Sequence, residues 1–227
     1  MTRTFVMGDA QAPAATLMAV LDRHGALRGD RLADDVVLIS IGDHFDYDLH
    51  DPVTAGREGL TFLRWLASHD PAQAVLLLGN HDAARVMELV AISDERFAQA
   101  RAFARALDGD PARDLRFAAA FPDLPTPGLV GRDYASFSVA QRDLVRALLL
   151  AGRFHLARTG ALPDGRPVVL SHAGVTRREL ALLGAADAPV AIAAALEALL
   201  AGAIAAVRDD WARGVATPLS LAPVHAA

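Results

Sequence analysis

The residues best placed to do chemistry are Asn80, His81 and Asp82, which follow a strand-like apolar run and one glycine in Leu76-Leu77-Leu78-Gly79. A carboxamide oxygen can ligate a metal ion, and an imidazole beside a carboxylate can act as an oriented proton donor. Polar residues after a strand also cap helices, and Asn80 or Asp82 could cap a helix beginning near Ala83. The motif alone leaves both interpretations open.

Potential metal ligands follow three further apolar runs, in the motifs Gly8-Asp9-Ala10-Gln11, Gly42-Asp43-His44-Phe45-Asp46 and Ser171-His172-Ala173-Gly174. Turn chemistry explains any single Gly-Asp pair after a strand. In open α/β sheets, however, ligands collect at the carboxyl ends of the strands. The motifs together therefore predict one shared site. Its oxygen and nitrogen donors suit Mn, Fe or Zn better than calcium.

The composition excludes several mechanisms and partners. The 227 residues include no cysteine, and all 22 basic residues are arginine. Thiol catalysis, thiolate metal sites, disulfides, Schiff-base chemistry and a P-loop are therefore excluded. The net charge of −5 provides no basic footprint, so no nucleic-acid partner is expected. The amino terminus runs straight into a strand without a signal-peptide core, which predicts a soluble, cytoplasmic protein.

The elements that must position the motifs are alternating strands and helices. Apolar runs predict strands at residues 4–7, 36–41, 74–78, 168–170 and 219–222. Helical patterns predict helices at 14–24 and 53–68, between the first strands. We expect an α/β fold in one domain, residues 1–227, with a mixed, sandwich-like sheet core flanked by helices in a four-layer arrangement.

Residues 83–160 differ from the rest because they contain helical patterns and no convincing strand. So much helix between two strands predicts an insertion that caps the ligand edge of the sheet. The expected helices span 83–92, 94–107, 112–120 and 138–151. Two more helices are expected after the fourth strand, at 177–183 and 189–210.

The segment 188–207 is nearly all apolar, with Glu197 as its only charge. Its large residues recur at helical spacing on one side. One such stripe favours a helix packed on the core or on a second copy of the chain. A membrane span would be apolar all round, so no membrane partner is expected.

The four motifs, spread over about 170 residues, resemble those of calcineurin-like metallophosphoesterases. Within that superfamily they are most similar to the branch of serine/threonine phosphatases and diadenosine tetraphosphatases. The combination of Gly79-Asn80-His81-Asp82 with Gly42-Asp43-x-x-Asp46 carries the resemblance, since the other two motifs alone are not specific. The resemblance implies hydrolysis of a phosphate ester or phosphoanhydride.

The resemblance also implies a dinuclear metal site. Asp43 would bridge two divalent ions, with manganese favoured and iron, zinc or magnesium as alternatives. Asp9 and Gln11 would hold one ion, and Asn80 and His172 would hold the other. A metal-bound hydroxide would attack phosphorus in line, because such ions activate water and neutralise phosphoryl charge.

The proton donor implied by the resemblance is His81, which would protonate the leaving alkoxide as general acid. Asp46 would orient its far ring nitrogen, the usual arrangement for a catalytic imidazole. Phosphoester cleavage needs charge neutralisation, an activated water and a leaving-group acid. The residue types in the motifs supply all of them.

The chain departs from the family pattern at several positions. Gln11 stands where the family has histidine, which predicts a weaker site or a residue that only hydrogen-bonds a loop. Tyr47 and Leu78 stand where the phosphatase branch has arginines that clamp phosphate. Another arginine could supply this clamp, and the candidates are Arg85, Arg132 and Arg142. Each of them is nevertheless expected at the surface.

Three other histidines have less certain roles. The family completes its metal set with a histidine, and after His172 only His225 remains. His155 could line the pocket, although core packing is the simpler expectation. His44 could face substrate or stabilise its loop.

Two classes of function remain open. The leading hypothesis is a metal-dependent phosphoesterase acting on a small phosphorylated substrate or a phosphoprotein. The alternative is a catalytically impaired protein on the same fold, with an incomplete metal site and a binding or regulatory role. A homodimer through the 188–207 helix is compatible with either hypothesis.

Overall fold

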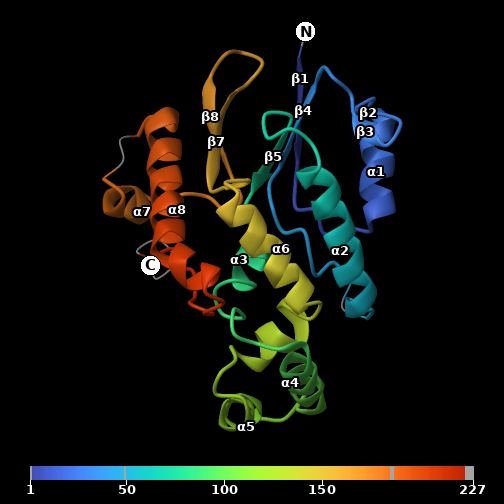
Figure 1. The fold of residues 1–227 in the computed structure, drawn as a ribbon, viewed down its shortest axis with the longest axis vertical. Helices are drawn as coiled ribbons and strands as arrows, with labels where there is room; N and C mark the ends of the chain where they lie inside the picture. The colour runs from blue at the N-terminus through green and yellow to red at the C-terminus, as the bar shows by residue number, and fades with distance from the viewer. Residues whose placement is uncertain (1, 49, 185–186, 223–227) are drawn as a thin grey trace.

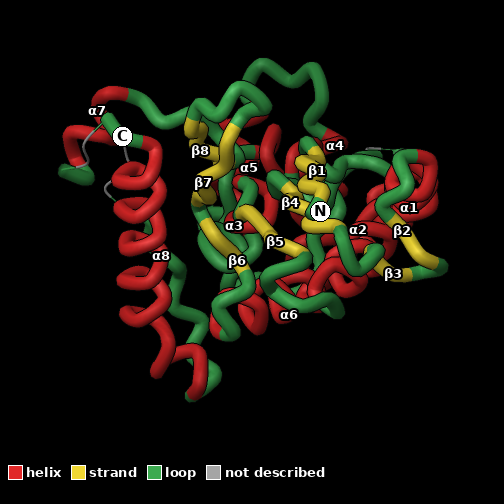
Figure 2. The backbone as a smooth tube through the Cα atoms, turned by 90° about the horizontal axis from the view of Figure 1, so that it is seen from above, coloured by secondary structure: helices red, strands yellow, loops and turns green. Residues whose placement is uncertain are grey.

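The computed structural model describes residues 2–48, 50–184 and 187–222. Helices cover one face of a parallel sheet, and a two-stranded hairpin packs on the other face (Figure 1). Viewed from above, the parallel sheet and this hairpin lie between α8 (Pro189–Ala212) and α1 (Ala14–Arg23), as Figure 2 shows. The predicted α/β class, with a sheet core flanked by helices, is confirmed.

The central sheet has the strand order β1-β4-β5-β6 and only parallel pairings. Its strands are β1 (Arg3–Met7), β4 (Val36–Ser40), β5 (Ala74–Leu77) and β6 (Phe154–His155). Because all of them run in one direction, their carboxyl ends meet at one edge. The expected mixture of parallel and antiparallel strands is therefore found between sheets, because this sheet is parallel and the hairpin is antiparallel.

Residues along each central strand alternate between two cores, as the two-residue period of a strand requires. Leu38 and Leu76 face the larger core, which they share with α1 and α2 (Pro52–Ala67). Ile39 and Val75 face a smaller cluster that includes Leu170 from the hairpin. Burial on both faces explains why these strands read as continuous apolar runs.

Helix α2 lies close against the loop that follows β4. It begins after Asp51, whose side chain accepts a hydrogen bond from the Thr54 N–H at 3.1 Å. A Cβ atom on Gly59 would lie 2.3 Å from the carbonyl oxygen of His44. Glycine at this helix position therefore permits the close approach, and α2 buttresses the loop that carries the second motif.

The hairpin consists of β7 (Ala157–Ala161) and β8 (Pro167–Ser171), which pair antiparallel and precede α7 (Arg177–Leu182). Helix α8 packs against both of its strands. The length and composition of α8 would suffice to cross a membrane, and it is the one such helix in the described residues. Its buried residues are Ala193, Leu196, Leu200, Ala203, Ile204, Val207 and Trp211.

A helical lobe lies below the carboxyl edge of the sheet (Figure 1). It contains a separate apolar cluster that includes Phe97, Phe117 and Phe121. This lobe therefore has a core of its own beside the site. Its elements are α3 (Asn80–Ala84), α4 (Asp94–Ala106), α5 (Arg113–Ala120) and the π-helical turn η1 (Leu129–Asp133). Helix α6 (Val139–Leu150) begins at this lobe and packs its apolar residues into the larger core.

Several predicted elements differ from the structure. Residues 83–160 were expected to contain no strand, yet they include β6 and the start of β7, both too short or too polar to stand out. The helix predicted at 83–92 ends at Ala84 and continues as turns. The strand predicted at 219–222 is wrong, because Leu219 is buried as irregular chain and donates its N–H to the Val86 carbonyl. Between the predicted helix 14–24 and the predicted strand 36–41, the chain also forms β2 (Leu27–Arg28) and β3 (Arg31–Leu32), which pair with each other.

Candidate active site

The loops after β4 and β5 approach each other closely at the carboxyl edge of the sheet. A Cβ atom on Gly79 would lie 2.1 Å from Asp43 Oδ1, and one on Gly42 would lie 2.6 Å from the Gly79 nitrogen. Asp43 and Asp46 have positive φ angles of 52° and 68°, a conformation that is uncommon outside glycine. The glycines in these motifs therefore permit an approach that any side chain would block.

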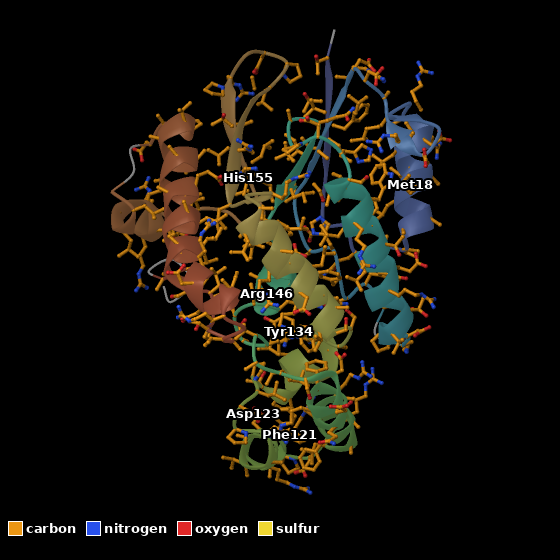
Figure 3. All side chains as sticks on the ribbon, in the orientation of Figure 1. Met18, Phe121, Asp123, Tyr134, Arg146 and His155 are labelled. Atoms are coloured by element: carbon orange, nitrogen blue, oxygen red, sulfur yellow. The ribbon has the colours of Figure 1, made fainter. Side chains whose placement is uncertain are left out.

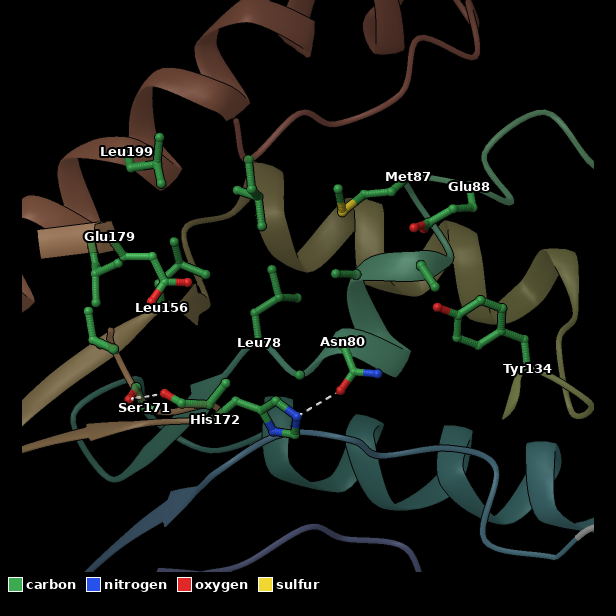
Figure 4. A pocket seen from close by; sticks show the side chains of 18 residues that line it. Leu78, Asn80, Met87, Glu88, Tyr134, Leu156, Ser171, His172, Glu179 and Leu199 are labelled. Atoms are coloured by element: carbon green, nitrogen blue, oxygen red, sulfur yellow. Dashed lines mark hydrogen bonds between the residues drawn. The ribbon is translucent and has the colours of Figure 1, made fainter. Parts of the chain in front are cut away.

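Asp43, Asn80 and His172 converge at this edge. The His172 Nε2 atom lies 2.9 Å from Asn80 Oδ1 and 3.5 Å from Asp43 Oδ2 (Figure 4). The Nδ1 atom of His172 lies 3.0 Å from the Ile41 carbonyl oxygen, which fixes the ring as a donor on that side. Its Nε2 atom then faces the oxygen atoms of Asn80 and Asp43.

Asp43 is only 4 % exposed, and its Oδ1 accepts a hydrogen bond from the His81 N–H at 2.9 Å. Burial raises the pKa of the Asp43 carboxyl, and the nearby Asp82 charge raises it further. His81 and His172 only partly offset this rise in the pKa. The carboxylate is thus held where it lacks compensating positive charge.

His81 and Asp46 form the predicted acid and orienting pair. The His81 Nδ1 atom lies 2.9 Å from Asp46 Oδ2, and its Nε2 atom lies 3.9 Å from Asp43 Oδ2. Burial lowers the pKa of His81, but the hydrogen bond to Asp46 and the Asp43 and Asp46 charges outweigh it and raise the pKa overall. Nε2 of this ring therefore faces the point where Asp43, Asn80 and His172 converge.

Arg85 holds the His81–Asp46 pair in place, although its side chain was expected at the surface. Its guanidinium, fully buried rather than at the surface, donates to Asp46 Oδ2 at 2.6 Å and to the His81 carbonyl at 2.6 Å. Ser136 in the helical lobe donates its N–H to Asp46 Oδ1 at 2.8 Å. Arg85 lies four residues after His81, one helical turn away, which was the available sequence signal. Arg132 carries an exposed side chain that pairs with Asp133.

A second buried pair supports the loops. The Asp82 carboxylate accepts hydrogen bonds from the backbone N–H groups of Asp43, His44 and Gly79, and the His44 ring lies 3.0 Å from it. The other ring nitrogen of His44 lies 3.0 Å from Ser40 Oγ. Burial disfavours the Asp82 carboxylate, yet His44 and these N–H donors keep its pKa below the usual value. His44 is fully buried, so it stabilises the loop rather than facing a substrate.

The first motif is placed at the same edge but more loosely. The Asp9 side chain is 55 % exposed, and its Oδ1 lies 3.8 Å from His172 Nδ1. Gln11 is exposed, two residues beyond Asp9 in the same loop. His225 lies outside the described residues.

The remaining candidate histidine, His155, ends β6 between the sheet and α8 (Figure 3). Its Nδ1 atom lies 2.7 Å from Glu197 Oε2, and the same carboxylate accepts the Leu156 N–H at 2.8 Å. The pair anchors α8 to the sheet. Glu197, the single charge in the apolar segment, thus has a structural role.

The donor set fits a divalent cation at one half of the edge. In residues 2–48, 50–184 and 187–222, no three His, Asp or Glu side chains close around one point. The amide oxygen of Asn80, however, joins His172 and Asp43 as a third donor within 3.5 Å. A buried carboxylate short of positive charge, an imidazole and an amide oxygen are donors that Mn, Fe and Zn accept.

A pocket with a volume of about 290 Å³ opens beside these donors (Figure 4). Asn80 and His172 form part of its wall, and Tyr134 from the helical lobe forms another part. The Tyr134 ring packs edge-on to His81 at 5.6 Å between centroids. Burial, with the nearby Glu88 charge, raises the pKa of Tyr134 to about 12, so its hydroxyl remains a donor.

The fold and the residues gathered at its edge define a phosphoester hydrolase. The chain belongs to the calcineurin-like phosphoesterase family, whose model matches residues 2–182. No curated protein and no solved structure gives a match. Membership of the family makes the chain a metal-dependent phosphoester hydrolase in general terms, without specifying a branch.

Proposed function

We propose that the chain hydrolyses a phosphate ester or phosphoanhydride, with His81 as general acid and two divalent cations, manganese in particular, at the sheet edge. The observation that carries this proposal is the placement of His81. Its Nδ1 atom is bound to Asp46 at 2.9 Å, while Nε2 lies 3.9 Å from Asp43 Oδ2. A carboxylate-oriented imidazole beside a cluster of metal donors suits protonation of a leaving alkoxide.

Asn80 and His172 would hold one cation with Asp43, and Asp9 and Gln11 would hold the other with Asp43. When bound, the cations supply neutralisation of phosphoryl charge and activation of water.

The protein's own residues position the proton. Asp46 accepts from His81 Nδ1 and fixes the ring orientation. Arg85 keeps Asp46 ionised, and Ser136 fixes the second carboxylate oxygen. His81 thereby directs the opposite nitrogen toward the leaving group, and the hydrogen bond to Asp46 with the nearby carboxylates raises the pKa of His81 above its usual value.

The test is hydrolysis of p-nitrophenyl phosphate and of an alkyl phosphate with added Mn²⁺, in the wild type, Asp43→Ala and His81→Ala. Asp43→Ala is expected to abolish both reactions. His81→Ala should lower alkyl ester hydrolysis by about 10²–10⁴-fold, the usual range for a general acid. The aryl ester should lose less, because nitrophenolate leaves without protonation.

His24→Ala is the matched control, since His24 is exposed at the end of α1. Unchanged turnover in both Asp43→Ala and His81→Ala would refute the proposal. Equal losses on the two esters would refute only the acid role of His81.

One observation favours the binding or regulatory alternative. Asp9 and Gln11, the two ligands proposed for one cation, are both exposed. Counting bound Mn²⁺ by calorimetry distinguishes the candidates. Two ions with turnover support the enzyme, whereas a single ion without turnover supports the alternative.

A further inference from the structure

The pocket beside Asn80 and His172 has an apolar wall built from distant parts of the chain. Leu78 and Met87 flank Asn80, and Leu156 lies near β7 (Figure 4). Leu196 and Leu199 come from α8, which lies outside the residues 2–182 that match the family. The part of the wall from α8 therefore lies outside the residues that match the family.

The charges around the pocket are negative. Its described lining residues include Glu88 and Glu179 but no arginine. Arg85, the nearest arginine in the sequence to the Gly79-Asn80-His81-Asp82 motif, is committed to Asp46 and has no exposed surface. Because the chain contains no lysine, the described part of the lining offers no cationic side chain other than His172 to neutralise additional substrate anions. A second phosphate or a carboxylate on the substrate would therefore meet an unfavourable field.

The size of the pocket suits a small organic group. Its volume of about 290 Å³ lies near the lower end of the range for ligand pockets, roughly 300–1,000 Å³. Tyr134 adds a hydroxyl donor on the side of His81. One end of the pocket thus holds Asn80 and His172, Tyr134 links its wall to His81, and its body is apolar.

We infer that this pocket binds the alcohol portion of the substrate, and that the preferred substrates are phosphate monoesters of uncharged, apolar alcohols. This inference rests on the proposed function and adds the substrate class. The phosphoryl group lies at the Asn80 and His172 end, next to His81. The alkyl or aryl group extends along Leu78, Met87 and Leu199. Nucleotides with several phosphates and phosphoproteins are disfavoured.

A matched ester series tests the inference in the Mn²⁺-loaded protein. From ethyl to hexyl phosphate, kcat/KM should rise about fourfold for each added methylene, the fold-change expected for burying one CH₂. The same hexyl ester with a carboxylate at its far end should be on the order of tenfold poorer, because the acidic wall repels it. Binding of hexylphosphonate, which is not hydrolysed, measures the same preference by calorimetry.

Introducing a positive charge into the wall gives a result that misfolding cannot imitate. Leu199→Arg should raise kcat/KM for the carboxylate-ended ester relative to hexyl phosphate by on the order of tenfold or more. Leu182→Arg, on the exposed face of α7, is the matched control and should leave the ratio unchanged. Leu199→Ala should flatten the chain-length dependence.

The outcomes separate the two hypotheses. If no ester is hydrolysed with any cation, the proposed function fails and the substrate class fails with it. If esters are hydrolysed but chain length and terminal charge have no effect, only the pocket assignment fails. A preference for nucleotides over hexyl phosphate would also overturn the inference.

Discussion

Replacing Arg85 with methionine tests how the acid is held in place. The Arg85 side chain is fully buried, donates to Asp46 Oδ2 at 2.6 Å and lies 4.8 Å above the Phe45 ring. Methionine keeps much of the aliphatic length beside Phe45 and removes the charge with all its donors. Arg85→Met therefore leaves the Asp46 carboxylate buried without its guanidinium.

Removing one partner of a buried ion pair destabilises a protein by about 3–5 kcal/mol. Since Asp46 retains hydrogen bonds from Ser136 and His81, we expect a loss of about 3 kcal/mol in the free energy of unfolding at neutral pH. This loss corresponds to more than about a hundredfold in the folding equilibrium.

The loss should depend on pH in a defined direction. In the wild type, burial raises the pKa of Asp46, but the Arg85 charge and the hydrogen bonds from His81 and Ser136 outweigh it, so the pKa lies below its usual value. The pair therefore contributes stability above the unfolded pKa of 3.8, and this contribution is lost only below it. Without Arg85 the pKa of Asp46 rises above the unfolded value. The penalty is then present at neutral pH and shrinks as the pH falls toward that raised pKa.

Urea unfolding of the wild type and Arg85→Met at neutral and mildly acidic pH measures both effects. Arg96→Met is the matched control, because Arg96 pairs with Asp123 at the surface, with side chains 35 % and 44 % exposed. Arg96→Met should lower the free energy of unfolding by less than about 1 kcal/mol. The double variant Arg85→Met/Asp46→Asn should recover part of the stability. The reasoning fails if Arg85→Met is no more destabilising than Arg96→Met, or if its penalty grows on acidification.

Three further predictions concern the loops, a remote histidine and the metal. Gly79→Ala should weaken Mn²⁺ binding, measured by calorimetry, by on the order of tenfold, because the new Cβ would lie 2.1 Å from Asp43 Oδ1. Gly8→Ala is the control and should leave Mn²⁺ binding unchanged, because a Cβ on Gly8 would meet no atom within 4 Å. His69 is 2 % exposed and accepts the Leu32 N–H, and burial lowers its pKa below 6.5. Stability should therefore fall as the pH drops below 6.5, and His69→Leu, costing about 1–3 kcal/mol, should unfold with less dependence on pH in that window. Chelation with EDTA should abolish hydrolysis and lower the melting temperature, and Mn²⁺ at about 100 times its Kd should restore about 2.7 kcal/mol.

The strand-end motifs could be predicted because short-range patterns encode them. A continuous apolar run followed by Gly-Asp or Gly-Asn places its polar residues at the carboxyl edge whatever the rest of the chain does. Parallel pairing of β4 with β5 then brings Asp43 and Asn80 together. His172 reaches them from the end of β8, in the antiparallel hairpin that packs on the sheet. The roles assigned to these residues stay a prediction until metal binding is measured.

The residues that support the site could not be predicted in the same way. Arg85 has the sequence context of a surface arginine, and only the helical lobe, through Ser136 and Gln141, buries it. The sequence patterns did not predict the short strand β6 for a similar reason, since β6 has two residues and gains its stability from pairing with β5. In both cases the information lies in contacts between segments 50 or more residues apart.

The fold holds the two halves of the proposed metal site differently, and this difference determines how Gln11 would affect cation binding. The Asp43 side chain is 6 % exposed and bound by a backbone N–H, whereas the Asp9 side chain is 55 % exposed. An exposed side chain loses rotamer freedom when it binds a cation, so the half with Asp9 and Gln11 gains less free energy from similar contacts. His81 is held from the opposite side, through the pair that Ser136 anchors to the helical lobe. In the proposed site, a weak ligand at position 11 would therefore lower the affinity for one cation and leave the position of His81 unchanged.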